Sequence, residues 1–128
     1  MKAIIETNNP LVAEKYKDQY MIDFHEDSLV SVLNRVRDKI HEGHQLLTHP
    51  LSGSVKPNET IYKSILLSYS KGELDMNSLM IIESSIETAL KLIHMKKPPQ
   101  WSEKILADFR EIDYTLIKSG IESMRQLG

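Results

Sequence analysis

The chain has 128 residues, of which 41% are hydrophobic and 27% are charged, a composition that suits one domain of ordinary size. The formal net charge of -2 argues against broad binding to a nucleic-acid backbone, because such binding requires a basic surface. The sequence has no cysteine, which excludes disulfides, thiolate catalysis and cysteine-based metal centres.

Targeting and membrane signals are weak along the whole sequence. Residues 1–10 hold too short an apolar run for a signal peptide, and no stretch approaches the roughly 18 apolar residues of a membrane span. The sequence also shows no internal repeat and no low-complexity stretch. We therefore expect a cytoplasmic protein without a membrane segment, folded as a single domain over residues 1–128.

The first half of the chain predicts two strands and two helices. Residues 2–7 form a short apolar strand. Residues 8–10, Asn-Asn-Pro, end that strand and suit the start of a short helix over residues 11–17. Alternating residues 20–24 predict the second strand. A helix over residues 28–42 follows, with apolar side chains at helical spacing and a glycine just beyond its end.

The second half predicts two more strands and a helical C-terminal part. The strands cover residues 46–48 and 61–69, and the latter has a near-continuous apolar run typical of a buried strand. A helix over residues 75–95 comes next and ends before a Lys-Lys-Pro-Pro spacer. A helix over residues 102–112 and a last helix over residues 113–124 complete the prediction.

The order of these elements favours an α/β fold. Strands that alternate with helices at this spacing predict a parallel sheet covered on both faces. We therefore expect a small three-layer Rossmann-like sandwich with a short, mostly parallel four-stranded sheet. The alternative is an α+β fold in which the fourth strand, over residues 61–69, is antiparallel. That alternative requires only that residues 48–60 act as a wide hairpin.

The polar segment over residues 48–60 is the part of the chain most typical of a binding site. Connections between neighbouring elements usually need about 2–6 residues, so a longer one suggests a function. In open α/β sheets, ligands bind at the carboxyl ends of the strands, where the strand order reverses. With a strand order of 2-1-3, Asn8 and Asn9 would neighbour the segment that contains His49. These two turns therefore form one predicted site.

Four residues of the polar segment have the chemistry of an anion cradle. Ser52, Gly53, Ser54 and Lys56 offer backbone N–H groups, two hydroxyls and a cation. The segment lacks the GxxxxGK[ST] spacing of a P-loop, and no GxGxxG occurs in the chain, which disfavours nucleotide-triphosphate motors and Rossmann dinucleotide sites. The alternative is a turn-rich loop with Lys56 in solvent.

Three further residues are candidates for ligand contacts, each with a structural alternative. Asn8 and Asn9 are candidate hydrogen-bond donors to an anion, and capping of the next helix is the alternative role. Lys63 lies within a predicted buried strand, where a lysine must reach solvent or find a partner. It is either a site residue or half of a salt bridge at the rim.

His49 is the candidate catalytic residue because it directly follows a predicted strand and imidazole exchanges protons near neutral pH. His41 and His44 lie on either side of Gly43, where a helix is predicted to end, so their rings need not converge. The zinc motif HExxH is absent. We expect neither a metal ion nor a cofactor.

Three stretches of the chain resemble the GrdX family: residues 7–12 (TNNPLV), 43–60 (GHQLLTHPLSGSVKPNET) and 62–64 (YKS). The similarity spans nearly the whole chain, and the central string is long enough to be specific. Ile61 stands where the family pattern has proline. The resemblance implies an association with the glycine, sarcosine and betaine reductase systems of anaerobic bacteria. It implies no catalytic residue.

Three functions follow as hypotheses, and a non-catalytic role is favoured. The first is an accessory or regulatory protein of such a reductase system that binds a small anionic metabolite, phosphate or an acetyl-phosphate-like group at the strand edge. The second is a protein that acts on a glycine or betaine reductase subunit, and the C-terminal helices are also candidates for a homodimer seam. The third is a small hydrolase or transferase with His49 as base and Lys56 stabilising negative charge.

Overall fold

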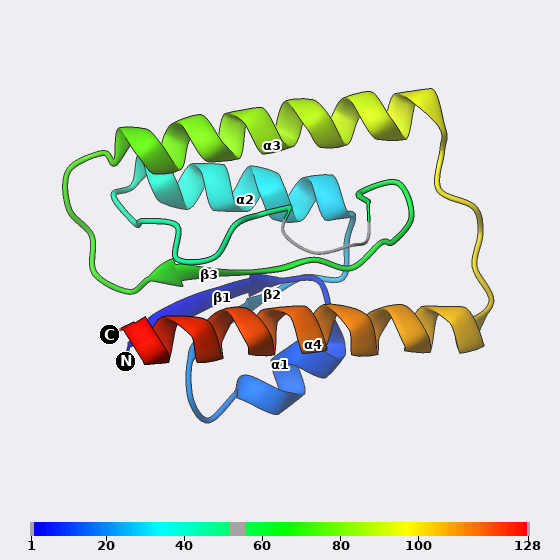
Figure 1. Ribbon diagram of the computed structural model, residues 1–128, viewed down its shortest axis with the longest axis horizontal. Coiled ribbons are helices and arrows are strands. Elements are labelled where there is room, and N and C mark those ends of the chain that lie inside the picture. Colours follow the sequence, from blue (N-terminus) through cyan, green and yellow to red (C-terminus); the bar gives the residue numbers. More distant parts are fainter. Residues whose placement is uncertain (1, 52–55, 128) are drawn as a thin grey trace.

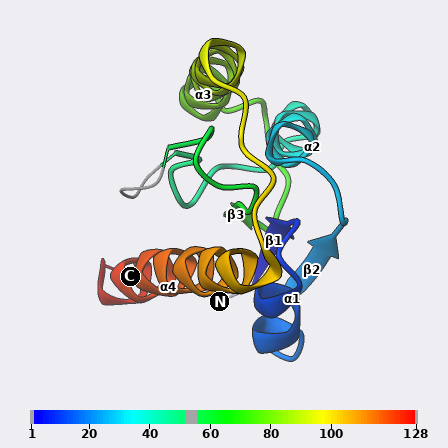
Figure 2. The same cartoon turned by 90° about the vertical axis from the view of Figure 1, so that its right-hand side faces the viewer.

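The structure, a computed structural model, describes residues 2–51 and 56–127, and within them the chain forms a three-stranded sheet and four helices. The sheet lies between two helical layers, with α2 and α3 on one face and α1 and α4 on the other (Figure 1). Turning the molecule by 90° shows the same two layers end on (Figure 2). The elements are β1 (Ala3–Thr7), α1 (Pro10–Tyr16), β2 (Met21–Phe24), α2 (Leu29–His41), β3 (Ser64–Ser68), α3 (Met76–Met95) and α4 (Glu103–Leu127).

The strand order β2-β1-β3 brings distant turns together. β1 runs parallel to β2, with Thr7 opposite Phe24, and antiparallel to β3, with Thr7 opposite Ser64. The carboxyl ends of β1 and β2 therefore meet the amino end of β3 at one edge. We call this the strand edge.

The prediction of a four-stranded sheet was wrong for the described residues, because residues 46–48 do not form a strand. Leu46 makes only an isolated antiparallel bridge to Leu67. The backbone N–H groups of Leu47 and Thr48 both donate to the carbonyl of Leu66, and Leu66 donates in turn to the Thr48 hydroxyl, at 3.0 Å. A side chain thus takes the place of a backbone acceptor and interrupts the ladder.

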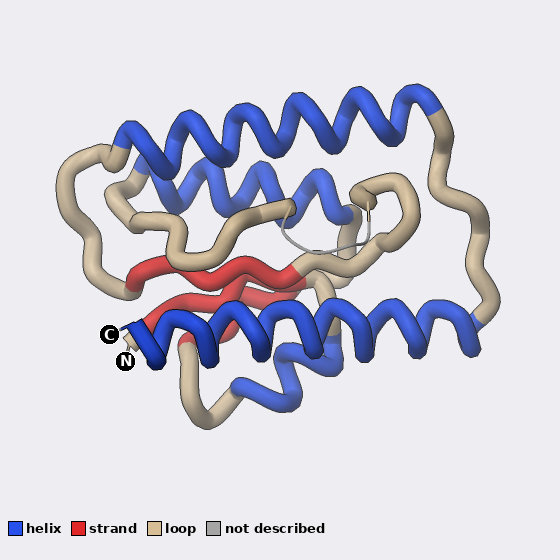
Figure 3. Tube along the Cα trace, viewed as in Figure 1, coloured by secondary structure: helices blue, strands red, loops and turns tan. Residues whose placement is uncertain are grey.

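The predicted strand over residues 61–69 is shorter in the structure, as β3, and its antiparallel direction matches the alternative fold prediction. A parallel neighbour requires a crossover connection, usually a helix. The chain between α2 and β3 forms no helix in its described part and runs back over the sheet as loop (Figure 3). The mostly parallel, Rossmann-like arrangement was therefore not obtained.

Alternate residues of the central strands face two separate hydrophobic clusters, which reflects the two-residue period of a strand. Ile65 and Leu67 pack into the cluster that α2 and α3 cover. Ile5 and Leu66 pack into the cluster that α1 and α4 cover. Both faces of β1 and β3 are thus buried, which explains the near-continuous apolar runs in these two strands.

Helix starts agree with the sequence signals. Asn9, Ser28 and Asp75 are N-caps whose side chains accept hydrogen bonds from backbone N–H groups in the first turn. The prediction of two helices after residue 101 was wrong, because α4 is continuous from Glu103 to Leu127. Asp113, expected to start the last helix, lies in the middle of α4 with its side chain buried.

The connection over residues 96–102 crosses from one helical layer to the other (Figure 3). It contains Pro98 and Pro99, which cannot continue α3. As a result α3 and α4 lie on opposite faces of the sheet. No described helix combines the length and the apolar composition that a membrane crossing needs.

Candidate functional site

The side chain of Asn8 connects three segments at the strand edge by hydrogen bonds. Its amide nitrogen donates to the carbonyls of Asp27, at 2.9 Å, and Ile61, at 2.6 Å. Its amide oxygen accepts from the backbone N–H of Lys63, at 2.9 Å. Asn8 thus brings together its own turn, the loop after β2 and the chain just before β3. Its predicted neighbourhood with the segment that contains His49 stays a prediction, and the two amide donors of Asn8 already have protein acceptors.

Asn9 and Asp113 form a second buried junction beside the first. The amide nitrogen of Asn9 donates to the Arg110 carbonyl and to Asp113 Oδ2, while its oxygen caps α1 through Leu11 N. Asp113 also accepts from the backbone N–H and the hydroxyl of Ser64, at 3.1 and 2.7 Å. One carboxylate thus joins α4 to the ends of both β1 and β3.

Lys63 is a buried cation without a hydrogen-bond partner for its ammonium among the residues that the structure describes. Only 6% of the residue is exposed. Burial lowers the pKa of the Lys63 ammonium, and the nearby charge of Asp113 offsets this only in part. Burial likewise raises the pKa of Asp113, against the hydrogen bonds from Asn9 and Ser64. Groups perturbed in this way are common at functional sites.

Two small hollows lie next to Lys63 and Asp113. One, of about 10 Å³, also touches Thr60 and Phe109. The other, of about 20 Å³, also touches His49, so this predicted residue does come close to Lys63. Such volumes hold a water molecule at most. His49 accepts a hydrogen bond from Leu51 N on its Nδ1 atom and lies on the exposed side.

A much larger cleft opens at the strand edge, with a volume of about 350 Å³. We call it the strand-edge cleft. It lies where the carboxyl ends of the parallel pair β1 and β2 face the start of β3, and its volume falls in the lower range of metabolite pockets. Its lining residues are Asn8, Pro10, Glu26, Asp27, Ile61, Tyr62 and Arg110.

Arg110 is the cation of the strand-edge cleft. It donates to the Tyr62 hydroxyl at 2.8 Å, and its guanidinium lies 5.6 Å from the centre of the Tyr62 ring. A second bond goes to Glu103, whose side chain is 77% exposed. A guanidinium has five N–H donors, so these two bonds leave capacity for an anion. The hydrogen bond and the ring contact with Tyr62 fix the orientation of the Arg110 guanidinium.

The described structure does not test the predicted anion cradle over residues 52–56. Ser52, Gly53 and Ser54 lie outside the described residues. Lys56 is exposed, and its carbonyl accepts from Glu59 N in a turn. The cradle itself stays a prediction.

Comparison with known proteins gives one result. The family model for GrdX-like proteins matches residues 4–122. The chain belongs to this family. No curated protein and no solved structure gave a significant match. The resemblance noted in the sequence is thereby confirmed, and the matched region contains every residue of the strand-edge cleft.

Sequence reasoning missed Arg110 and Asp113, the two site residues of α4. Asp113 had a readable signal, because it occupies an apolar stripe in which Phe109, Ile117 and Ile121 recur at four-residue spacing. A carboxylate at such a position must find buried partners. Arg110 had no comparable signal, because its relation to Tyr62 depends on a contact between residues 48 positions apart.

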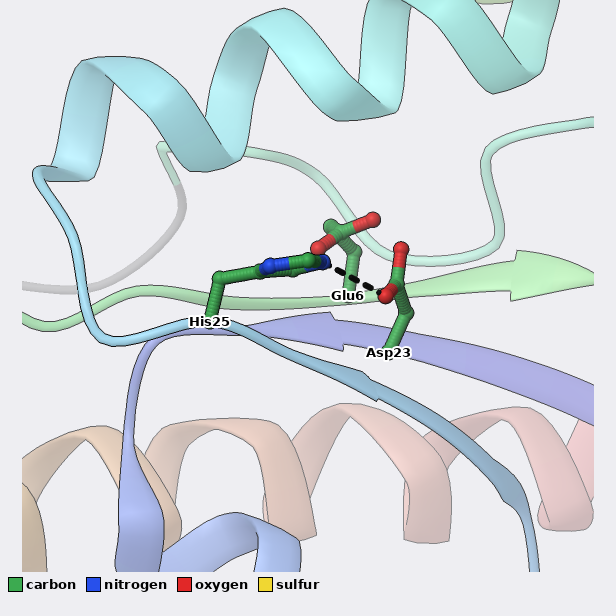
Figure 4. Close-up of side chains that lie close together, drawn as sticks. All are labelled: Glu6, Asp23 and His25. Carbon is green, nitrogen blue, oxygen red and sulfur yellow. Dashed lines mark hydrogen bonds and ion pairs between the residues drawn. The ribbon is translucent and has the colours of Figure 1, made fainter.

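A charged cluster under α2 also escaped prediction. Glu6 is fully buried on β1 and accepts from Arg35 Nε, at 2.8 Å, and from Lys39 Nζ, at 2.7 Å. Lys39 also donates to Asp23, which pairs with His25 at 2.8 Å. Figure 4 shows the side chains of Glu6, Asp23 and His25 gathered on one face of the two parallel strands.

Electrostatics make this cluster a structural network. Burial, and after it a hydrogen bond with Asp23, raises the pKa of Glu6 to about 7, opposed by hydrogen bonds from Arg35 and Lys39. Although burial also acts to raise the pKa of Asp23, hydrogen bonds with Glu6 and Lys39 lower it overall. Glu6, Asp23 and His25 each bring one ligand atom to within 4.8 Å of the others, a spacing compatible with a metal ion. However, Arg35 and Lys39 already supply cations to these carboxylates, so the geometry by itself does not call for a metal.

Proposed function

We propose that this chain is an accessory protein of the glycine reductase type, as its GrdX-like family membership supports, and that it binds a small anionic ligand in the strand-edge cleft. The observation that carries the binding proposal is Arg110, a guanidinium held in place by Tyr62 at the wall of a 350 Å³ cleft. The cleft lies at the sheet edge where ligands of α/β proteins commonly bind.

Arg110 suits an anionic group for two reasons. The guanidinium is planar and can donate two parallel N–H bonds to the two oxygens of a carboxylate or phosphate. Its bond to the exposed side chain of Glu103 contributes little stability, so a ligand oxygen can replace that carboxylate at low cost. Lys63, which follows Tyr62 in the chain, is not part of the cleft lining, and its charge lies near that of Asp113.

The predicted residues take indirect roles in this proposal. Asn8 and Asn9 hold the loops that form the cleft, since their amide groups bond to Asp27, Ile61 and Asp113. Ser52, Gly53, Ser54 and Lys56 stay candidates for further anion contacts. The reductase systems for sarcosine and betaine, a reductase-subunit partner and catalysis by His49 also stay predictions.

Binding is testable by thermal unfolding with a panel of small anions, with and without an amino group: phosphate, acetyl phosphate, acetate and amino acids. A ligand at a hundredfold excess over its Kd adds about 2.7 kcal/mol to the stability of the native state. We expect at least one member to raise the melting temperature of the wild type by several degrees, and Arg110→Gln to abolish that rise.

Arg37→Gln is the matched control, because Arg37 is a surface arginine of α2 that pairs with Glu83 and lies outside the cleft. It removes the same charge and should leave the ligand-induced rise intact. If no anion stabilises the wild type, or if Arg110→Gln and Arg37→Gln respond alike, the proposed site is wrong.

The second hypothesis, an interaction with a reductase subunit, has one supporting observation. Three apolar side chains are exposed at the start of α3 and just before it: Leu74, Met76 and Met80, which are 42%, 58% and 68% exposed. Methionines suit adaptable protein contacts. This surface is the place where we would look for such a partner.

A further inference from the structure

The strand-edge cleft carries charges of both signs. Arg110 forms one part of the lining, and Glu26 and Asp27 form another. Asp27 already has a cationic partner, because both of its carboxylate oxygens accept hydrogen bonds from Arg35. Glu26 has no hydrogen bond or ion pair among the described residues. The cleft therefore has one partly available cation and one uncompensated carboxylate.

This arrangement disfavours a ligand with negative charge alone. An anion bound to Arg110 would also experience repulsion from Glu26 inside the same cleft, and both charges would lose part of their hydration. A ligand with an additional ammonium group would turn that repulsion into attraction. Complementary charge at both ends would also fix the orientation of the ligand.

We propose that the strand-edge cleft binds a small zwitterion, an amino-acid-like molecule whose anionic group contacts Arg110 and whose ammonium contacts Glu26. This inference rests on the proposed binding function and specifies its ligand class. The volume of about 350 Å³ suits a molecule of metabolite size. Ile61 and the ring of Tyr62 supply apolar surface between the charged groups.

The solvent exposure of Glu26 and Arg110 sets how strongly the cleft should prefer a zwitterion over the matched acid. Glu26 is exposed, so both its attraction to an ammonium and its repulsion of a bare anion are screened by water, and each contributes up to about 1 kcal/mol. Together they amount to about a tenfold difference in affinity rather than several orders of magnitude. Arg110 is better fixed and more buried, with 20% of its side chain exposed. Its loss should therefore weaken binding more than the loss of Glu26.

The test uses three zwitterions of increasing charge separation: glycine, β-alanine and γ-aminobutyrate. Each is compared with the acid that lacks its amino group: acetate, propionate and butyrate. Affinities are measured by NMR titration of the wild type, Glu26→Gln and Arg110→Gln. We expect one zwitterion to bind about tenfold more tightly than its matched acid, and the length preferred reports the distance between the two charged contacts.

The variants separate the two contacts. Glu26→Gln should remove the preference for the zwitterion and leave the affinity for the matched acid equal or higher, whereas Arg110→Gln should weaken both. Glu73→Gln is the control, since Glu73 is exposed just before α3 and outside the cleft. Equal melting temperatures of the free proteins establish that each variant folds.

Two outcomes would overturn the inference, and they differ in what they say about the proposed function. If the acids bind as tightly as the zwitterions, or Glu26→Gln keeps the preference, the cleft binds anions but does not select zwitterions. If neither class binds in a manner that depends on Arg110, both proposals fail together.

Discussion

Glu6 is the only charged residue in the five-residue strand β1. Its buried position explains why α2 carries two cationic side chains on the face toward the sheet. Arg35 and Lys39 lie four residues apart on one helix face and both reach this carboxylate. Their side chains are about one-fifth exposed, so the network is partly shielded from water. Removing Arg35 or Lys39 would take one of its two cationic partners from the fully buried Glu6, which is costly.

We expect Glu6 to make stability depend on pH between 4.5 and about 7. In this range the unfolded chain has lost the proton that folded Glu6 keeps, so the free energy of unfolding falls as pH rises through the window. The pKa rise from 4.5 to about 7 corresponds to at most about 3 kcal/mol. The measurement is urea unfolding of the wild type and Glu6→Gln at several values from pH 4.5 to 8.

The free energy of unfolding of the wild type minus that of Glu6→Gln should decrease as pH rises from 4.5 to about 7, and should level off above pH 7. Glu14→Gln is the control, because it removes an exposed carboxylate whose ion pair is with Lys17 on the protein surface. A difference that stays constant, or increases with pH, would show that Glu6 is already ionised in the folded protein at pH 5.

The turn after α2 depends on a close approach between two glycines. Gly43 has a φ of 110°, a left-handed conformation that L side chains rarely adopt. Its carbonyl accepts from Gly72 N at 3.0 Å, and a Cβ on Gly43 would overlap the Gly72 carbonyl oxygen. The end of α2 and the loop before α3 are thereby held together.

Gly43→Ala should lower the free energy of unfolding by on the order of 3 kcal/mol, because backbone strain and the overlap with Gly72 act together. The measurement is the denaturant midpoint at neutral pH. Gly72→Ala is the matched control: a Cβ there meets nothing within 4 Å, and we expect a change near zero. Similar losses in both variants would contradict this explanation of the turn.

Across the whole molecule, one short sheet supports two hydrophobic clusters. Leu33 of α2 lies in one cluster and Ile117 of α4 in the other, and both clusters include residues of the same two strands. Neither helical layer can bury its apolar face without the sheet. The clusters should therefore unfold together, as expected of the single domain predicted from the sequence.

Leu33→Ala and Ile117→Ala should each lower the free energy of unfolding of the whole domain by about 2–5 kcal/mol, and each should move one common unfolding transition to lower denaturant concentration. Far-UV circular dichroism reports all helices, whereas fluorescence reports Trp101, which packs against Phe109 at the start of α4. The two signals should coincide in the wild type and in both variants. Separate transitions would mean that the two layers are independent units.

Much of the local structure was readable from the sequence. The caps at Asn9, Ser28 and Asp75 and the turn at Gly43 depend on residues only a few positions apart, so local chemistry specifies them. The family relation was also readable, since it depends on the residues alone. The strand order predicted that the Asn8 turn would neighbour the segment that contains His49, which stays a prediction; the hydrogen bonds of Asn8 go to Ile61 and Lys63, directly before β3.

Tertiary contacts alone decided the direction of β3, the continuity of α4 and the lining of the cleft. A strand with both faces buried has the same apolar pattern in either direction. Its sequence therefore does not reveal which strand it pairs with, or whether the pair is parallel or antiparallel. Arg110 reaches Tyr62, and Glu26 shares their cleft, only because residues far apart in the chain fold to one edge. Local sequence patterns encode caps, turns and periodicity, whereas a binding site made of side chains from several elements exists only once those elements have packed.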